Sequence, residues 1–207
     1  MTLKWFRVDK SKTLQPEGKY SQWKGIVRDE CLGQCVYCAI NEAGFGGVRN
    51  FHIDHYRPKK TFDNLRDAIS NLFYACSICN SFKGADWPAE PISDHSVPAY
   101  PNPSEIDYSE IFEASARGVV TSRYAAGRYV IERLYINRPQ MIMARRRMQL
   151  VGEIERDSKV LLDHLSKGAI PTDLMPGVAD ILNQCIRAVA GLQKISPYEP
   201  EDAARPK

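Results

Sequence analysis

The sequence predicts a mostly helical α+β protein, in which a small β-hairpin enclosed by paired cysteines is followed by a helical C-terminal part. Two runs of strand-like composition, residues 50–56 and 71–75, lie between the cysteine pairs. Beyond residue 109, apolar side chains recur at the spacings of packed helices, most clearly in residues 174–195. A short hairpin in a largely helical chain follows from these two patterns.

The N-terminal elements are expected in the order helix, hairpin, helix. Residues 21–31 predict a short helix with its apolar side chains on one side. The first strand should end before Pro58, because proline cannot donate a ladder hydrogen bond. The second strand should lead into a helix that begins near Cys79 or Asn80. A charged loop of about a dozen residues would then join the two strands.

Prolines divide the chain into three parts. Pro88, Pro91, Pro98, Pro101 and Pro103 fall within one short stretch, which favours an extended connection over a helix. We therefore expect an N-terminal domain at residues 1–87, a connection at 88–108 and a helical extension at 109–207. Within that extension, Pro139 is expected to interrupt the helical pattern before it resumes at residue 141.

Composition excludes several protein classes. The chain has 207 residues, of which 43% are hydrophobic and 26% charged, so it can bury a real core. Six cysteines are too few for a disulfide scaffold of this length. No signal peptide is recognisable, and no apolar run approaches the roughly 20 residues that cross a bilayer. A cytoplasmic protein without a membrane span is the resulting expectation.

The positive charge is concentrated in one segment. The formal net charge is only +3, yet residues 117–150 hold a single acid, Glu132, among many arginines. The arginines of this segment are Arg117, Arg123, Arg128, Arg133, Arg138, Arg145, Arg146 and Arg147. Such a cluster is typical of surfaces that meet phosphates, and the run 145–147 is its densest part. The alternative is a solvated helix face on which arginine stems cover apolar surface.

Four cysteines predict a structural zinc site. Cys35 and Cys38 form one C-x-x-C pair, and Cys76 and Cys79 form a second. Two residues between cysteines let both thiolates reach one ion, and two such pairs complete a tetrahedral sulfur shell. A redox dithiol or buried cysteines that pair by chance would not explain the two matched spacings. Because cysteine fills all four positions, this zinc would have no open position for a water.

Residues that can perform chemistry lie between the cysteine pairs. Asp54 offers a hard oxygen ligand for a divalent cation, and the adjacent His55 can take a proton near neutral pH. If zinc closes the hairpin, Asn80 is brought to the strand end that presents both residues. In a regular strand the two side chains would point to opposite faces, so the strand must end or distort there. His52 shares the face of Asp54 and is either a metal contact or a hydrogen-bonded strand residue.

These residues resemble the HNH endonucleases of the ββα-metal type, in the subclass with zinc knuckles whose last motif residue is asparagine. The motif order C-x-x-C, I-D-H-x-x-P-K, N-L and C-x-x-C-N-x-x-K-G covers about residues 31–87. It is present as Cys35/Cys38, Asp54-His55 through Lys59, Asn71-Leu72, and Cys76/Cys79-Asn80 through Lys83-Gly84. The resemblance implies a ββα-metal HNH core stapled by the four-cysteine zinc site, with residues 1–87 as the nuclease domain.

The resemblance also implies a role for each site residue. His55 would be the general base, while Asp54 and Asn80 would hold one catalytic Mg²⁺ or Mn²⁺. Asn71 would brace the loop that orients His55. Phosphate contacts are expected from Lys59, Lys60 and Lys83, and from the arginine run Arg145, Arg146 and Arg147. The implied activity is hydrolysis of nucleic-acid phosphodiester bonds, with DNA favoured over RNA as the substrate.

Two questions of function stay open at this level. A looser resemblance to stand-alone bacterial HNH nucleases, including those paired with an ATPase in anti-phage defence systems, suggests an ATPase or another protein as partner. The alternative to an enzyme is a non-catalytic, zinc-stapled subunit that binds nucleic acid or protein. That alternative gives no reason for Asn71-Leu72 or for an asparagine directly after the fourth cysteine.

Overall fold

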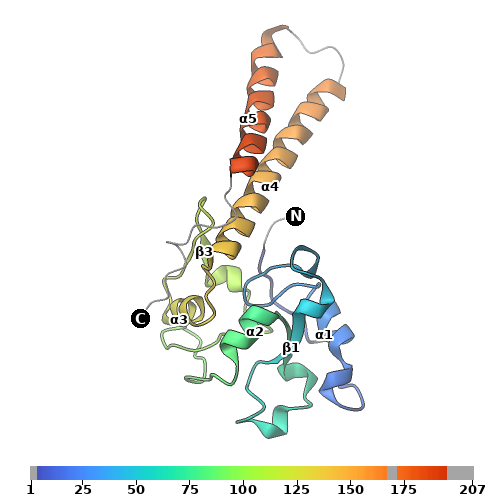
Figure 1. Cartoon of the computed structure of the whole chain (residues 1–207), viewed down its shortest axis with the longest axis vertical. Coiled ribbons are helices and arrows are strands. Elements are labelled where there is room, and N and C mark those ends of the chain that lie inside the picture. The colour runs from blue at the N-terminus through green and yellow to red at the C-terminus, as the bar shows by residue number, and fades with distance from the viewer. Residues whose placement is uncertain (1–3, 167–171, 195–207) are drawn as a thin grey trace. The chain divides into compact units, whose positions relative to one another are not determined.

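A computed structural model describes residues 4–166 and 172–194 of the chain. The chain forms two compact units, shown by element in Figure 1. Of the described residues, the first unit contains those up to Ser115 and Val119–Asn137, and the second contains Ala116–Gly118 and those from Arg138 onward. The α+β class and the mainly helical C-terminal part are as predicted.

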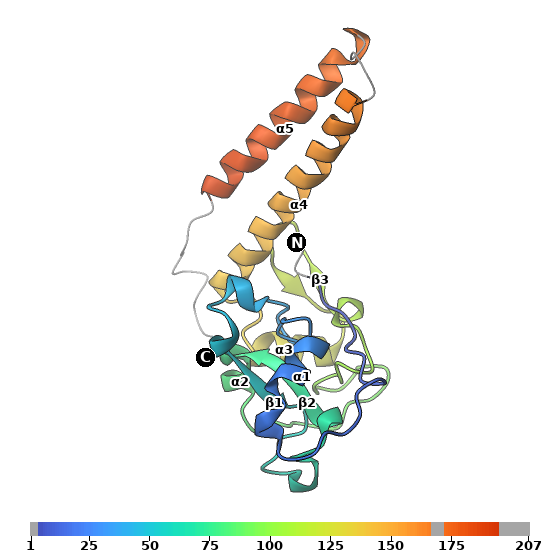
Figure 2. The same ribbon diagram turned by 90° about the vertical axis from the view of Figure 1, so that its right-hand side faces the viewer.

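The first unit is built on a two-stranded antiparallel hairpin. Strand β1 (Phe51–His55) pairs with β2 (Leu72–Cys76), and the register places Asp54 opposite Phe73. Helix α1 (Lys24–Glu30) and helix α2 (Ser77–Lys83) pack beside the hairpin, as Figure 2 shows. All five residues of β2 are buried, so this strand runs through the core of the unit. The predicted order of helix, hairpin and helix is confirmed.

Helix α2 begins earlier than the sequence predicts. Its first residue is Ser77, two or three residues before the expected start. Cys76 is the N-cap, and its Sγ accepts a hydrogen bond from the Cys79 amide at 3.5 Å. Cysteine is not one of the usual cap residues Ser, Thr, Asp and Asn, which explains the missed boundary. The helix ends at Lys83 and is capped by Gly84, whose φ of 53° lies in the left-handed region.

The edge of β2 that faces away from β1 forms hydrogen bonds with groups that do not belong to a strand. The Lys10 ammonium donates to the Leu72 carbonyl at 2.7 Å. The Val36 amide donates to the Tyr74 carbonyl at 3.0 Å, and the Tyr74 amide donates to the Cys31 sulfur at 3.4 Å. The backbone groups of Leu72 and Tyr74 that point away from β1 therefore have partners inside the unit.

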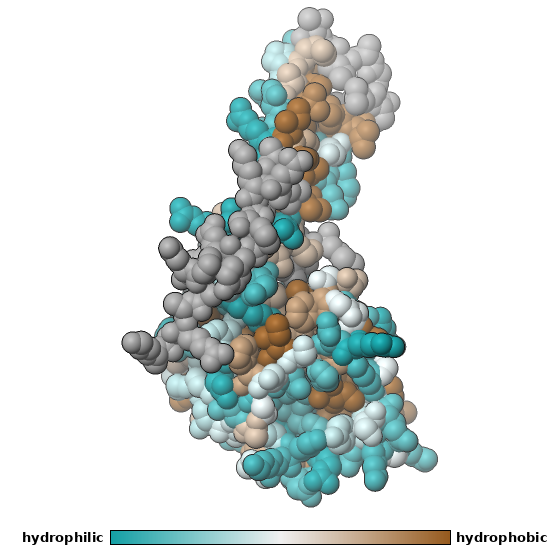
Figure 3. All heavy atoms as spheres, viewed as in Figure 1, coloured by the Kyte–Doolittle hydropathy of each residue, from teal (hydrophilic) through white to brown (hydrophobic). Residues whose placement is uncertain are grey.

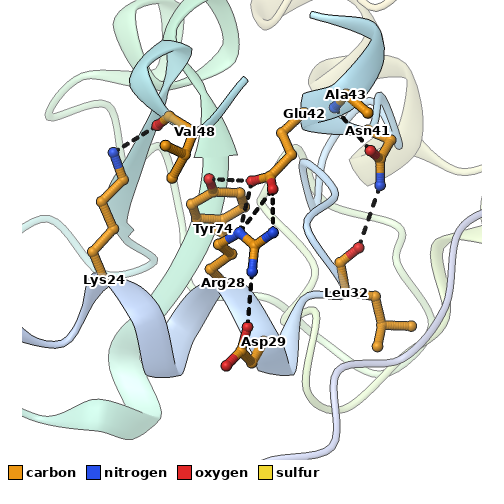
Figure 4. A network of polar contacts seen from close by, with 9 residues as sticks. All are labelled: Lys24, Arg28, Asp29, Leu32, Asn41, Glu42, Ala43, Val48 and Tyr74. Carbon is orange, nitrogen blue, oxygen red and sulfur yellow. Dashed lines mark hydrogen bonds and ion pairs between the residues drawn. The ribbon is translucent and has the colours of Figure 1, made fainter. Parts of the chain in front are cut away.

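A polar network joins α1 to β2 on one side of the hairpin (Figure 4). Arg28 of α1 donates to both carboxylate oxygens of Glu42, with Nε–O distances of 2.8 and 3.0 Å. The Tyr74 hydroxyl donates to the same carboxylate at 2.6 Å. Bonds from Arg28, and secondarily from Tyr74, hold the pKa of Glu42 below its ordinary value of 4.5.

The proline-rich connection is ordered by buried tyrosines. The Tyr56 hydroxyl donates to the Tyr100 carbonyl, and the Tyr108 hydroxyl donates to the Pro101 carbonyl, both at 2.7 Å. Asp86, just after α2, accepts from the hydroxyls of Tyr100 and Tyr129. These bonds satisfy polar groups in a segment that has little regular secondary structure of its own.

Beyond this connection, the first unit ends in a small hairpin and one helix. Strands β3 (Glu113–Ala114) and β4 (Val120–Thr121) pair antiparallel, and α3 (Ala125–Arg133) follows them. The hairpin was not predicted, because two-residue strands are too short to give an alternating pattern. Tyr129 lies on α3, so its bond to Asp86 ties this helix to the end of α2.

The second unit contains two long helices. Helix α4 (Pro139–Ser166) and helix α5 (Met175–Lys194) lie side by side as a hairpin in Figures 1 and 2. We expected Pro139 to interrupt the helical pattern. Instead it occupies the first position of α4, where its missing amide proton is not needed. Apolar side chains run along the hairpin in the view of Figure 3. Among the described residues no helix is long and apolar enough to span a membrane.

Candidate functional site

The four predicted cysteines converge in the core of the first unit. The sulfur atoms of Cys35, Cys38, Cys76 and Cys79 lie within 4.8 Å of one another, and all four residues are buried. The sulfurs of Cys38 and Cys76 are 3.8 Å apart. A tetrahedron of sulfurs about 2.3 Å from a central zinc has edges of about 3.8 Å, so the observed spacing fits this ion.

The chemistry of the cluster also fits a cation. Burial, reinforced by the three neighbouring thiols, raises the pKa of the Cys35 thiol well above its ordinary value. Four thiolates can therefore share this space only with a positive charge between them. Cys31 is buried but does not belong to the cluster, so it is a core residue and not a further ligand. The four-cysteine cluster supports the predicted zinc site.

A hollow of about 340 Å³ lies where β1 ends. It is lined by Ile53, Asp54, His55, Pro58, Lys59, Lys60, Asn80, Gly84 and Ala85. The residues come from β1, from the turn that follows it, and from the second half of α2 and its end. The predicted base, the two predicted metal ligands and two predicted phosphate-binding lysines thus line one concave surface.

A larger hollow, of about 490 Å³, is lined in part by Asn71. Its lining includes the carboxylates of Glu90 and Glu105 but no histidine. Arg57 also lines it, but its charge is paired with Glu90 at 2.7 Å, so the charged side chains of the lining sum to a negative charge that would repel a phosphodiester. We therefore assign the predicted chemistry to the smaller hollow.

Asp54 is a buried carboxylate held from two sides. Its side chain is 3% exposed, and its Oδ2 accepts a hydrogen bond from the Tyr37 hydroxyl at 2.6 Å. Its Oδ1 accepts from the Lys83 ammonium at 3.2 Å. Each carboxylate oxygen has a second lone pair, so both bonds leave room for a further ligand. Tyr37 lies between Cys35 and Cys38, which connects the cysteine cluster directly to the orientation of Asp54.

Our prediction of a phosphate contact for Lys83 is wrong. The side chain is fully buried, with an exposed fraction of 0%. Its ammonium binds the Asp54 carboxylate and also donates to the His55 carbonyl at 2.6 Å. Lys83 therefore joins the end of α2 to the end of β1 from inside the protein, and does not face a substrate.

His55 is oriented by two contacts. Its Nε2 lies 2.9 Å from the Arg66 carbonyl oxygen, which can only accept, so Nε2 carries the proton and Nδ1 keeps a lone pair. The ring also meets the Tyr20 ring edge-on, with 4.6 Å between centroids. Burial lowers the pKa of His55, and the charge of Lys59 adds to this effect, while the bond to Arg66 opposes it. A neutral imidazole near pH 7 is the form that can accept a proton.

Asn71 lies outside the hollow and braces the loop that follows β1. Its Oδ1 accepts from the Arg57 amide at 2.8 Å, and its Nδ2 donates to the carbonyls of Arg57 and Leu65 at 2.9 and 3.2 Å. The next residue after Leu65 is Arg66, whose carbonyl holds His55. These bonds are compatible with the bracing role that we expected for Asn71.

The remaining predicted residues lie in different environments. His52 is exposed and does not line the hollow. Arg145 is buried, and its Nη1 donates to the Gly118 carbonyl at 2.6 Å, so a phosphate contact predicted for Arg145 is wrong. Arg146 and Arg147 are exposed on α4, where their predicted contact with phosphates is sterically open.

Comparison with known protein families identifies the segment that carries the site. Residues 35–86 match the HNH endonuclease family model. The matched HNH segment begins at the first cysteine of the cluster and contains the hairpin, the hollow and α2. No significant match was found among curated proteins or among solved structures. The HNH match indicates a nuclease-type function that involves metal and nucleic acid.

Two residues of the site were missed in the sequence. Tyr37 is inside the HNH segment, but nothing in the C-x-x-C spacing distinguishes a residue that bonds to Asp54. Tyr20 lies outside the segment, 35 positions before His55, and only the fold brings the two rings together.

Proposed function

We propose that this protein is a metal-dependent HNH endonuclease that hydrolyses phosphodiester bonds of DNA. The observation that carries the proposal is the hollow in which Asp54, His55 and Asn80 meet. All three belong to the segment that matches the HNH endonucleases.

Asp54 and Asn80 would hold one Mg²⁺ or Mn²⁺. A carboxylate and an amide oxygen form a hard-oxygen donor set of the kind that these cations prefer. When bound, the cation polarises a phosphoryl oxygen and stabilises the leaving oxygen. Asn80 follows Cys79 directly, so the zinc cluster fixes the start of the helix that carries it. Lys83 fixes the other end of the same helix against β1.

His55 would act as the general base at Nδ1. Because Nε2 donates to the Arg66 carbonyl, the lone pair of Nδ1 is the one free to take a proton from an attacking water. The imidazolium formed in this step would stay bound to the same carbonyl. In-line attack by that water would leave a 5′ phosphate and a 3′ hydroxyl on the products.

Lys59 and Lys60 would contact the phosphate backbone. Both are exposed and line the hollow beside His55. Contacts of this kind position a nucleic acid without reading its sequence. The lysines therefore support a nuclease that places any phosphodiester strand across the hollow.

The test is cleavage of supercoiled plasmid with Mg²⁺ or Mn²⁺. We expect His55→Ala to lower the nicking rate at least about 100-fold, the usual contribution of general-base catalysis. His52→Ala is the matched control, since His52 is on the same strand but exposed and outside the hollow. Equal rates for His55→Ala and the wild type would exclude His55 from the mechanism. Cleavage of RNA in place of plasmid would overturn the assignment of DNA.

A further inference from the structure

We propose that Tyr20 is a positioning residue of the active site, fixing the His55 imidazole with its ring and the Lys59 ammonium with its hydroxyl. This inference rests on the proposed nuclease function and extends it to a segment outside the HNH match. Tyr20 begins the short 3-10 helix Tyr20–Gln22, ahead of α1.

The ring of Tyr20 restricts how His55 can turn. The two rings meet at 77°, with centroids 4.6 Å apart, which is a favourable edge-to-face geometry. The Arg66 carbonyl holds Nε2 of the same imidazole. An imidazole held at one nitrogen alone can still swing about that bond, and a second contact through the ring removes this freedom. Tyr20 therefore helps to keep Nδ1 in one orientation.

The hydroxyl of Tyr20 holds Lys59. The Lys59 ammonium donates to this hydroxyl at 2.6 Å and lies 4.7 Å from the centroid of the Tyr20 ring. An exposed lysine otherwise samples many rotamers, and ordering it on binding costs free energy. Because two of its ammonium protons remain available, Lys59 can meet a phosphate while it keeps the bond to Tyr20.

The segment before Tyr20 fastens the loop that holds His55. The Tyr20 amide donates to the Asp67 carboxylate at 2.8 Å. Gln15 donates through Nε2 to the Asp67 carbonyl at 2.8 Å and accepts through Oε1 from the Ile69 amide at 2.9 Å. Asp67 follows the residue whose carbonyl binds His55. Residues 15–20 thus act on the imidazole twice, through the Tyr20 ring and through this loop.

Two substitutions separate the functions of the ring and the hydroxyl. Tyr20→Ala removes both, and we expect kcat for plasmid nicking to fall about 10- to 100-fold, the scale of effect from misplacing a catalytic group. Tyr20→Phe keeps the ring and removes the bond to Lys59. We expect kcat of Tyr20→Phe to lie within about threefold of the wild type, while KM rises severalfold.

The chain offers a matched control in Tyr124. Its ring meets the His95 ring edge-on at 5.5 Å, and its hydroxyl accepts from Arg123 at 2.7 Å. A tyrosine, a histidine and a basic side chain thus meet again away from the hollow. Tyr124→Ala should change neither kcat nor KM, so any general effect of removing such a tyrosine would be visible in this variant.

A second measurement separates this proposal from the nuclease function itself. The ¹⁵N shifts of the His55 ring, assigned by their loss in His55→Ala, should report the Nε2–H tautomer in the wild type. In Tyr20→Ala the Arg66 carbonyl still fixes this tautomer, but the ring can swing about that bond, so we expect the ring resonances to broaden; in Tyr20→Phe they should stay as in the wild type. If the three proteins show this pattern while the wild type cleaves no nucleic acid, the proposed function fails and the positioning role stands. An unchanged kcat and unchanged His55 ring resonances in Tyr20→Ala, or equal kcat losses in both variants, would overturn the positioning role.

Discussion

Replacing Lys83 by methionine tests whether its buried ammonium holds the site together. Lys83 is fully buried and Asp54 is 3% exposed, with 3.2 Å between the ammonium nitrogen and each carboxylate oxygen. Methionine has a similar length and flexibility, so the substitution removes the charge and its hydrogen bonds with little change of volume. The Asp54 carboxylate would keep the Tyr37 bond but lose its counter-charge.

The expected loss of stability is large. At 3.2 Å and an effective dielectric constant near 20, the attraction is on the order of 5 kcal/mol. Breaking one side of a buried pair typically costs about 3–5 kcal/mol, because the remaining charge stays desolvated. The same substitution also removes the hydrogen bond from Lys83 to the His55 carbonyl. With an m-value of about 2 kcal/mol/M, the urea midpoint should fall by about 1.5–2.5 M.

Tryptophan fluorescence during urea unfolding reports the stability of the first unit, which contains Lys83. All three tryptophans, Trp5, Trp23 and Trp87, belong to the first unit. Asp54→Asn in the Lys83→Met background should restore part of the loss, because it removes the uncompensated charge. Lys12→Met, at an exposed position, should stay within about 0.5 kcal/mol of the wild type. A cost below about 1 kcal/mol for Lys83→Met, or no recovery in the double variant, would refute the role of Lys83 in holding the site together.

Three further predictions concern other parts of the chain. Cys38→Ser should lower the zinc content from about one ion per chain and destabilise the first unit, whereas Cys31→Ala should keep the zinc; metal analysis measures both. Glu42→Gln should destabilise the protein near pH 7, and the difference from wild type should shrink as the pH falls below 4.5, because the lowered carboxylate pKa stabilises the fold only above that range. Neutralising Arg146 and Arg147 should reduce the slope of log affinity against log salt for DNA by up to about 2.

Each of these predictions has an outcome that would contradict it. Full zinc occupancy in Cys38→Ser would remove this sulfur from the coordination shell. A constant stability difference for Glu42→Gln between neutral and strongly acidic pH would mean that its carboxylate gains nothing from Arg28. An unchanged salt slope would assign the exposed arginines of α4 a role other than binding phosphates.

The site was predictable where chemistry dictates local spacing. A zinc ion shared by two knuckles requires two closely spaced cysteines in each, so the pairs are visible in the sequence and their convergence follows. Asp54 and Asn80 then meet because one precedes the end of β1 and the other follows a knuckle cysteine. The hairpin was predictable for a different reason, because residues 50–56 and 71–75 have the composition of strands.

Residues that depend on distant partners were not predictable. A lysine is almost never fully buried unless it is paired, so the sequence favours a surface position for Lys83 until its partner Asp54 is placed against it. Tyr20 lies far from any motif, and its contact with His55 exists only in the folded chain. Proline can follow the end of one helix or occupy the first position of the next. We expected Pro139 to interrupt the helical pattern, whereas it begins α4.

The blocked outer edge of β2 has a consequence for association between molecules. A two-stranded sheet normally exposes backbone donors and acceptors that can recruit a strand from another chain, which is a route to aggregation. In β2 the outward groups of Leu72 and Tyr74 are already bound by Lys10, Val36 and Cys31. The apolar strand β2 is therefore not available for β-pairing with another molecule along the edge that faces away from β1.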